Sequence, residues 1–319
     1  MDKKSNFIDI MKVICCLLII GSHSLPIFYH EELNFFYGQW LFRFCVPFFF
    51  IVTGFFFETM DDYRRMKYIE RIALIYVVST LLYLPVIVKN FSIRSLLFGY
   101  HHLWYLAALI FGLILYHTMD KLFGEHKKAV MIVSFAILGG GIILDEWHAV
   151  FNNNFIDTLS HFVEKIGGSR NGLFFAFPML SVGGLIRRNN WSIKKNEFIV
   201  FLLISFILGF CEAAFLKYRC GKDVTLDVTL FGWLPAIPLF LLSLKKASPI
   251  SDTTSRLIRK TVDIAYVIHV WIIVFVCDVI CIRYELGFIC ILFITFMISV
   301  ITLKLIISIR KACSDNYHT

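Results

Sequence analysis

Charged residues are scarce in this sequence, and their scarcity excludes a water-soluble globular protein. They make up 17% of the 319 residues, whereas soluble proteins contain about 25%. Apolar residues make up 58% of the chain, and the mean hydropathy is +0.75. A chain of this composition has too little polar surface to cover a globule in water. We therefore expect a multi-pass protein of the cell membrane, with the lipid bilayer as its main partner.

The cysteines lack the spacing of a metal site. Seven of the nine lie inside apolar runs, where cysteine behaves as a small hydrophobic residue. Cys277 and Cys281 are four positions apart, but no paired set of cysteine and histidine with zinc spacing accompanies them. We therefore expect no metal.

A signal-peptide cleavage site is also lacking. Lys3 and Lys4 precede an apolar stretch, but no small-residue cleavage site follows it. We interpret the stretch as an uncleaved first span. Apolar runs long enough to cross about 30 Å of hydrocarbon predict an all-α integral membrane domain over 1–319. Its ten expected spans lie near 8–29, 36–57, 70–88, 102–119, 129–145, 171–187, 198–216, 228–244, 262–280 and 286–309.

The basic residues predict how these spans are oriented. The net charge of +8 does not indicate a nucleic-acid partner, because lysine and arginine form short clusters between the apolar runs. With the N-terminus in the cytoplasm, the inner segments hold nineteen lysines and arginines and the outer segments hold eight. The excess of positive charge inside predicts that both termini are cytoplasmic. The longest loop, at about 146–170, is then external.

Ionisable side chains inside the expected spans are the candidate functional residues. Placing a charge inside a membrane is energetically unfavourable, so the charges found there are expected to serve a function. Their positions along the spans predict two layers. The inner layer holds Asp9, Lys12, Arg71 and His269, and the outer layer holds His23, Arg43, His101 or His102, Arg170 and Glu212. Lys12 and His23 share one helix face, separated by roughly 16 Å along the axis. His23 is the natural base of this set.

Simpler explanations exist for several of these residues. Asp9 and Lys12 are spaced to form a local ion pair, and Arg43 and Glu212 could only neutralise each other. The long side chain of Arg71 could extend to the lipid headgroups.

Several motifs, taken in order, resemble the membrane acyltransferase 3 family. Asp9-x-x-Lys12, followed by ten residues and then His23, resembles the first-helix signature of that family. The stretch from Val46 to Phe55 is similar to its second-helix pattern V-x-x-F-F-x-x-S-G. The further matching stretches are Glu70-Arg71-Ile72, His102-Leu103-Trp104-Tyr105-Leu106 and Ala265-Tyr266-Val267-Ile268-His269. The resemblance covers nearly the whole chain and implies ten spans.

Within that family, the chain looks most like the membrane domain of the VanT-type serine/alanine racemases of vancomycin resistance. The similar stretches are His23-Ser24-Leu25-Pro26, Arg43 with Val46-Pro47-Phe48-Phe49-Phe50, His102-Leu103-Trp104-Tyr105, and 169–175. In those proteins a cytoplasmic racemase domain that uses pyridoxal phosphate follows the last span. The resemblance implies that such a domain could be fused to this one, and that racemase chemistry is not in these residues.

The resemblance implies acyl transfer from cytoplasmic acyl-CoA, with acetyl-CoA as the expected donor. The expected catalytic residues are His23, Arg43 and Glu212, of which His23 is the general base. The expected donor-binding residues are Asp9, Lys12, Arg71 and His269, and the expected acceptor-binding residues are His102, Trp104, Arg170 and Asn171. Two alternatives remain open. One is a module that delivers L-serine and binds it through Arg43 or Arg170 together with Glu212. The other is a non-catalytic membrane anchor for a racemase domain.

Overall fold

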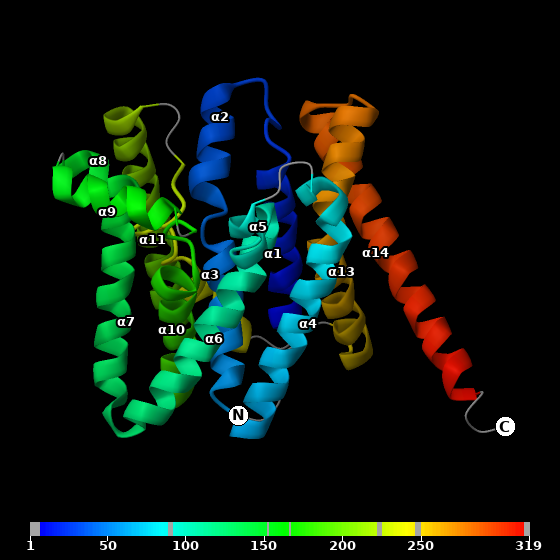
Figure 1. The fold of residues 1–319 in the computed structure, drawn as a ribbon, viewed down its shortest axis with the longest axis horizontal. Coiled ribbons are helices and arrows are strands. Elements are labelled where there is room, and N and C mark those ends of the chain that lie inside the picture. Colours follow the sequence, from blue (N-terminus) through cyan, green and yellow to red (C-terminus); the bar gives the residue numbers. More distant parts are fainter. Residues whose placement is uncertain are drawn as a thin grey trace. The chain divides into compact units, whose positions relative to one another are not determined.

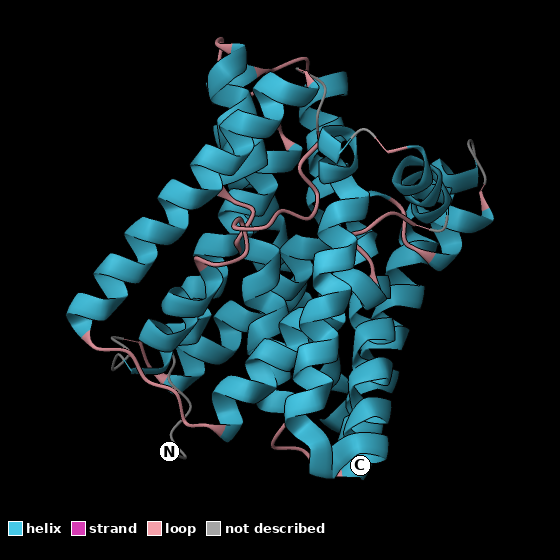
Figure 2. Ribbon diagram, turned by 90° about the vertical axis from the view of Figure 1, so that its left-hand side faces the viewer, coloured by secondary structure: helices cyan, strands magenta, loops and turns pink. Residues whose placement is uncertain are grey.

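The computed structural model describes residues 7–88, 92–151, 153–165, 167–221, 225–245 and 250–315. Within these ranges the chain is helical and contains no β-strand (Figure 2). Some basic residues in the orientation count lie outside the described residues, namely Lys3, Lys4, Lys89, Lys222 and Lys246. The chain divides into two compact units. Unit 1 comprises residues 1–38 and 243–319, and unit 2 comprises residues 39–242.

Unit 1 is built on three long helices, which Figure 1 labels. They are α1 (Phe7–His23), α13 (Asp252–Val274) and α14 (Tyr284–Asp315), with the short α2 (Glu31–Phe36) and the π-helical turn η7 (Phe275–Val279). Their core is apolar and includes Cys16, Ile20, Ala265, Val276 and Ile291. Because apolar residues recur on one face of α1 and of α13, the two helices pack side by side along their length.

Unit 2 contains the remaining helices. Two of its boundary elements, η1 (Tyr37–Leu41) and α12 (Ala236–Lys245), extend by a few residues into unit 1. The others are α3 (Cys45–Phe57), α4 (Asp62–Ile87), α5 (Ile93–Leu97), η3 (His101–Leu103), α6 (Trp104–Phe123), η4 (Gly124–His126), α7 (Lys127–Ile142), η5 (Ile143–Trp147), α8 (His148–Phe151), α9 (Asn154–Lys165), η6 (Gly172–Ala176), α10 (Phe177–Arg188) and α11 (Lys195–Cys220).

Helices α3 and α10 form the centre of unit 2, and glycine lets them touch backbone to backbone. A methyl group at Gly54 would collide with the carbonyl of Leu180, and one at Gly183 would collide with the carbonyl of Ile51. Small residues allow this close approach between apolar helices, where van der Waals contact is the main attraction.

In the part of the chain that the structure describes, seven helices are long and apolar enough to cross a membrane: Glu31–Phe57, Asp62–Ile87, His101–Phe123, Lys127–Asp145, Lys195–Cys220, Asp252–Val279 and Tyr284–Ile309. Each overlaps one of the expected spans. The expected spans near 8–29, 171–187 and 228–244 correspond to shorter helices, because α1 has 17 residues, α10 has 12 and α12 has 10. The multi-pass helical fold is thus confirmed, whereas the count of ten spans and the cytoplasmic termini stay predictions.

The expected external loop at about 146–170 contains two short helices, α8 and α9, and its position outside the membrane stays a prediction. Helices α8 and α9 lie across the end of α7 (Figure 1). Helix α9 is amphipathic, because its apolar residues recur at helical spacing, at Phe155, Ile156, Leu159, Phe162 and Val163. Of this apolar stripe Val163 is buried, whereas Phe155 and Phe162 are exposed. A short helix of this kind is not apolar enough to be recognised as a span, although its apolar residues recur at helical spacing.

Candidate functional site

Two histidine side chains meet at one end of the α1–α13 pair in unit 1. His23 is the last residue of α1 and is exposed, whereas His269 on α13 is fully buried. Their ring centroids lie 5.4 Å apart, with the planes tilted by 41°. The Nδ1 atom of His269 lies 2.8 Å from the carbonyl oxygen of Tyr266 and 3.2 Å from that of Ala265. Carbonyls only accept hydrogen bonds, so Nδ1 carries a proton and Nε2 is the basic nitrogen of the neutral ring.

A buried carboxylate lies at the other end of the same helix pair. Asp9 is fully buried, and its oxygens lie 3.8 Å from Lys12 Nζ and 3.7 Å from Arg259 Nε. The hydroxyl of Ser255 also donates to this carboxylate. The Asp9–Lys12 ion pair allowed by their spacing is therefore present, and α13 adds a second cation and a hydrogen-bond donor. We call these four residues the Asp9 cluster.

The structure corrects the expected depth of His269. Asp9 and Ser255 are in contact, and so are His23 and His269, so α1 and α13 run parallel. His269 thus lies beside the outer-layer His23 and not beside Lys12. The prediction was wrong because α13 begins at Asp252, well before the apolar run near 262. Its first turns are polar, and hydropathy alone does not reveal them.

Two of the expected outer residues, Arg43 and Arg170, come together in unit 2. Nη1 of Arg43 lies 3.4 Å from Oδ1 of Asp227, and Nη1 of Arg170 lies 3.1 Å from the same oxygen. Arg43 also donates to the side chain of Gln39. The guanidinium of Arg170 lies 5.2 Å from the centre of the Trp104 ring, a distance at which a cation interacts with an aromatic face.

Glu212 does not neutralise Arg43, so that explanation is wrong. The Glu212 side chain is buried and accepts hydrogen bonds from Trp147 Nε1 at 3.0 Å and from the backbone N–H groups of Leu230 and Phe231 at 2.6 and 2.8 Å. The carboxylate therefore fixes the segment that precedes α12. Its expected catalytic role stays a prediction.

The remaining expected residues lie in unit 2 and have structural contacts of their own. Asn171 caps η6, because its side-chain oxygen accepts from the N–H groups of Leu173 and Phe174, each at 2.9 Å. His102 is buried, and its ring packs against Tyr83 with the centroids 5.1 Å apart. Arg71 is exposed on α4, as it must be if its side chain extends to the lipid headgroups.

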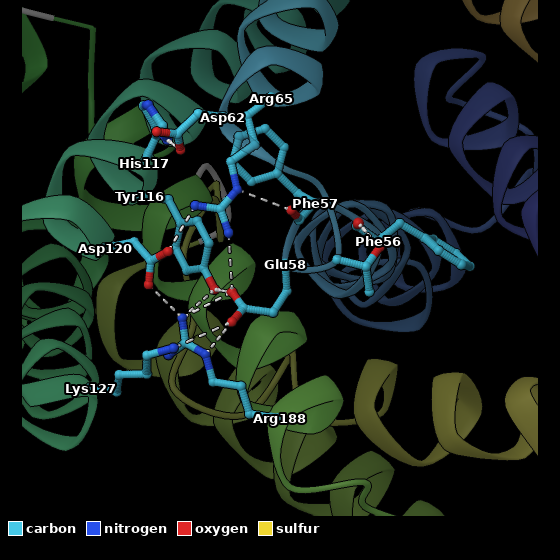
Figure 3. Close-up of polar contacts among 11 residues, drawn as sticks. Phe56, Phe57, Glu58, Asp62, Arg65, Tyr116, His117, Asp120, Lys127 and Arg188 are labelled. Atoms are coloured by element: carbon cyan, nitrogen blue, oxygen red, sulfur yellow. Dashed lines mark hydrogen bonds and ion pairs between the residues drawn. The ribbon is translucent and has the colours of Figure 1, made fainter. Parts of the chain in front are cut away.

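A polar network joins the ends of α3, α4, α6, α7 and α10 in unit 2, and the sequence did not predict it (Figure 3). Arg188 binds Glu58 at 2.5 and 2.9 Å and Asp120 at 2.8 Å. Arg65 binds Asp120 at 2.7 Å, and the Tyr116 hydroxyl donates to Glu58 at 2.6 Å. Lys127 from α7 lies 3.9 Å from Glu58. We call this group the Glu58 network.

Every charge in the Glu58 network faces an opposite charge. The side chains of Glu58 and Arg65 are only 10% and 8% exposed. The attraction between their opposite charges offsets the free energy that each loses when it is buried away from water. This pairing is typical of a group that holds helices together. It offers no unpaired group to a reactant.

The long apolar helices define a multi-pass membrane protein. A histidine pair and buried ion pairs lie between its helices. The acyltransferase domain model of the acyltransferase 3 family matches residues 5–304. The chain belongs to that family.

Comparison with curated proteins found three matches to racemases of enterococci. The chain is 26% identical to a serine/alanine racemase of Enterococcus gallinarum over 76% of this chain and 37% of that protein. It is 31% identical to an amino-acid racemase of Enterococcus faecalis over 66% of this chain and 32% of that protein. A second amino-acid racemase of Enterococcus faecalis is 25% identical over 86% and 42%. The chain thus spans about two fifths or less of the relatives it matches. No solved structure matches.

Proposed function

We propose that this domain transfers an acyl group from acyl-CoA to a small acceptor, with His23 as the general base. The observation that carries the proposal is the α1–α13 pair, which holds two imidazoles at one end and the Asp9 cluster at the other. Asp9 and His23 are fourteen residues apart, as are Ser255 and His269, which corresponds to about 21 Å along each helix. Membership of the acyltransferase 3 family supports this assignment.

The proposed reaction uses each end of the helix pair differently. Lys12 and Arg259 attract the phosphates of the donor, and the pantetheine arm extends towards the imidazoles. His23 takes the proton from a hydroxyl or amine of the acceptor, whose oxygen or nitrogen attacks the thioester carbonyl. The carbon–sulfur bond then breaks, and coenzyme A leaves as the thiol after it gains a proton. His269 sits behind His23 and positions its ring.

The test is acyl transfer by purified protein in proteoliposomes supplied with labelled acetyl-CoA. His23→Ala should lower the rate by about 10²–10⁴-fold, the usual effect of removing a positioned base. Binding of coenzyme A should stay within about twofold, because roughly 16 Å along α1 separates His23 from Lys12, the phosphate-binding cation on that helix. The matched control is His30→Ala, since His30 is also exposed and close in sequence but contributes no side-chain cap to α2. A wild-type protein that neither transfers nor hydrolyses the acyl group would reject the proposal.

Amino-acid delivery is the second candidate function. The relatives are named as serine/alanine and amino-acid racemases, and unit 2 holds Arg43 and Arg170 on one carboxylate of Asp227. A guanidinium pair of this kind can bind the carboxylate of a substrate such as L-serine if Asp227 releases one of them. Uptake of labelled L-serine by proteoliposomes that is lost in Arg43→Gln, together with no acyl transfer by the wild type, would favour this function.

A further inference from the structure

A small cavity opens beside the histidine pair, entirely within unit 1. Its volume is about 250 Å³, which is less than the 300–1,000 Å³ of typical ligand pockets. The lining includes Ser24, which follows His23 directly, and Ile273, which lies one helical turn after His269. The cavity therefore lies at the same end of the α1–α13 pair as the two imidazoles, which do not line it, and a molecule in it would have to be small.

Two opposite charges line the cavity without pairing. Asp278 and Arg283 both contribute to the wall. Neither side chain forms a hydrogen bond or an ion pair with another residue that the structure describes. The charges at Asp9, Glu58 and Asp227, by contrast, are all engaged by protein partners. Asp278 and Arg283 are thus available to the charges of a ligand.

The backbone around these two residues contains a π-helical turn and two residues with positive φ. Asp278 lies in the π-helical turn η7, a geometry that often occurs at functional sites. Cys281 and Tyr284 adopt left-handed conformations, with φ of 63° and 56°. Such conformations are unfavourable for residues other than glycine, and they cluster at functional sites. The ring of Tyr29 stacks on Tyr284 at 4.2 Å and holds this loop in place.

We infer that the cavity binds a small hydroxylated zwitterion, whose ammonium faces Asp278 and whose carboxylate faces Arg283. This inference rests on the proposed acyl transfer and names the class of its acceptor. An ammonium nitrogen has no lone pair, so the nucleophile must be the hydroxyl. Its oxygen forms an ester bond to the acyl carbon while His23 takes the hydroxyl proton. The carbon–sulfur bond of the thioester breaks, and coenzyme A departs as the thiol after it is protonated.

Binding is tested first, without any acyl donor, by calorimetry on purified protein in nanodiscs. L-Serine and L-alanine both carry the two charges and should bind within a few-fold of each other. Ethanolamine lacks the carboxylate and L-lactate lacks the ammonium, so each should bind at least about tenfold more weakly. Asp278→Asn and Arg283→Gln should each weaken L-serine binding by about tenfold or more. Equal binding of all four probes would overturn the inference.

A neighbouring charge provides the control for these variants. Glu285 is exposed on the first turn of α14 and does not line the cavity. Glu285→Gln should leave L-serine binding unchanged. A loss equal to that of Asp278→Asn would show that only the overall charge of this surface matters, and would overturn the site.

Acyl transfer is tested second, with labelled acetyl-CoA and an acid quench that prevents migration of the acyl group from oxygen to nitrogen. Label should appear on L-serine as an oxygen ester, identified by chromatography against O-acetyl-L-serine and N-acetyl-L-serine, and none should appear on L-alanine. Labelled N-acetylalanine would overturn the assignment of the hydroxyl as nucleophile. L-Serine binding that needs both charges, without any transfer, would uphold the site and reject the proposed function. Transfer to another acceptor without L-serine binding would uphold the proposed function and reject the site.

Discussion

The Glu58 network predicts a large loss of stability when one carboxylate is neutralised. Glu58 accepts hydrogen bonds from Arg188 and from the Tyr116 hydroxyl. Glu58→Gln keeps the size of the side chain but leaves Arg188 with Asp120 as its only carboxylate partner. Breaking a buried ion pair destabilises a protein by about 3–5 kcal/mol. Because Arg188 keeps Asp120 and is 21% exposed, we expect the lower end, about 3 kcal/mol.

The assay is equilibrium unfolding of the detergent-solubilised protein by SDS, followed by far-ultraviolet circular dichroism. The matched control is Glu70→Gln, because Glu70 pairs with Lys67 at 2.9 Å although both side chains are more than half exposed. That change should alter the free energy of unfolding by about 0–1 kcal/mol. The double variant Glu58→Gln/Arg188→Gln should lose less than the sum of the single variants. Equal effects of Glu58→Gln and Glu70→Gln would refute the reasoning.

Three further predictions concern topology, packing and donor binding. In a cysteine-free background, a cysteine at Lys128 should react with impermeant reagents only from the cytoplasm, and one at Asn153 only from outside. Gly183→Ala should lower stability by about 1–3 kcal/mol, because the methyl group would meet the carbonyl of Ile51 on α3; SDS unfolding measures it. Arg259→Gln should weaken acetyl-CoA binding by about tenfold and flatten its dependence on salt, as titration at two ionic strengths would show.

Each of these three predictions has its own control. Labelling of Asn153 from the cytoplasm would reverse the orientation. A methyl group at Gly139 meets nothing within 4 Å, so Gly139→Ala should be neutral or stabilising by up to about 1 kcal/mol; equal losses at both glycines would contradict the packing argument. Lys304 is exposed on α14, so Lys304→Gln should not affect donor binding. A matching loss there would show that general surface charge attracts the donor.

The sequence predicted the features that depend on local spacing. Seven of the expected spans are long apolar helices, because hydropathy over about 20 residues is a local property. The Asp9–Lys12 ion pair is also local, since residues three apart on a helix are neighbours. Arg43 and Arg170 were predicted to share a layer because each lies near the same end of its span, and the structure brings them together at Asp227.

Partners that are distant in sequence could not be predicted. Glu58 and Arg188 are 130 residues apart, and each lies at a span end, where a charge is ordinary. Asp227 lies in a polar segment without periodicity, so nothing marks it as the carboxylate for Arg43. The depth of His269 was misjudged for a related reason, because hydropathy registers the apolar part of a helix and not its polar first turns.

The two units differ in whether their charged side chains are engaged by other protein groups. In unit 2 the buried carboxylates of Glu58 and Glu212 are engaged by arginine, tyrosine and tryptophan side chains or by backbone N–H groups. Such contacts hold a structure together and would have to break before a reactant could use them. In unit 1 a cavity at the histidine end of the α1–α13 pair is lined by Asp278 and Arg283, whose side chains form no hydrogen bond or ion pair with another described residue. Polar groups that protein contacts leave available are ready to bind a substrate, and for this reason we propose that the acceptor binds in unit 1.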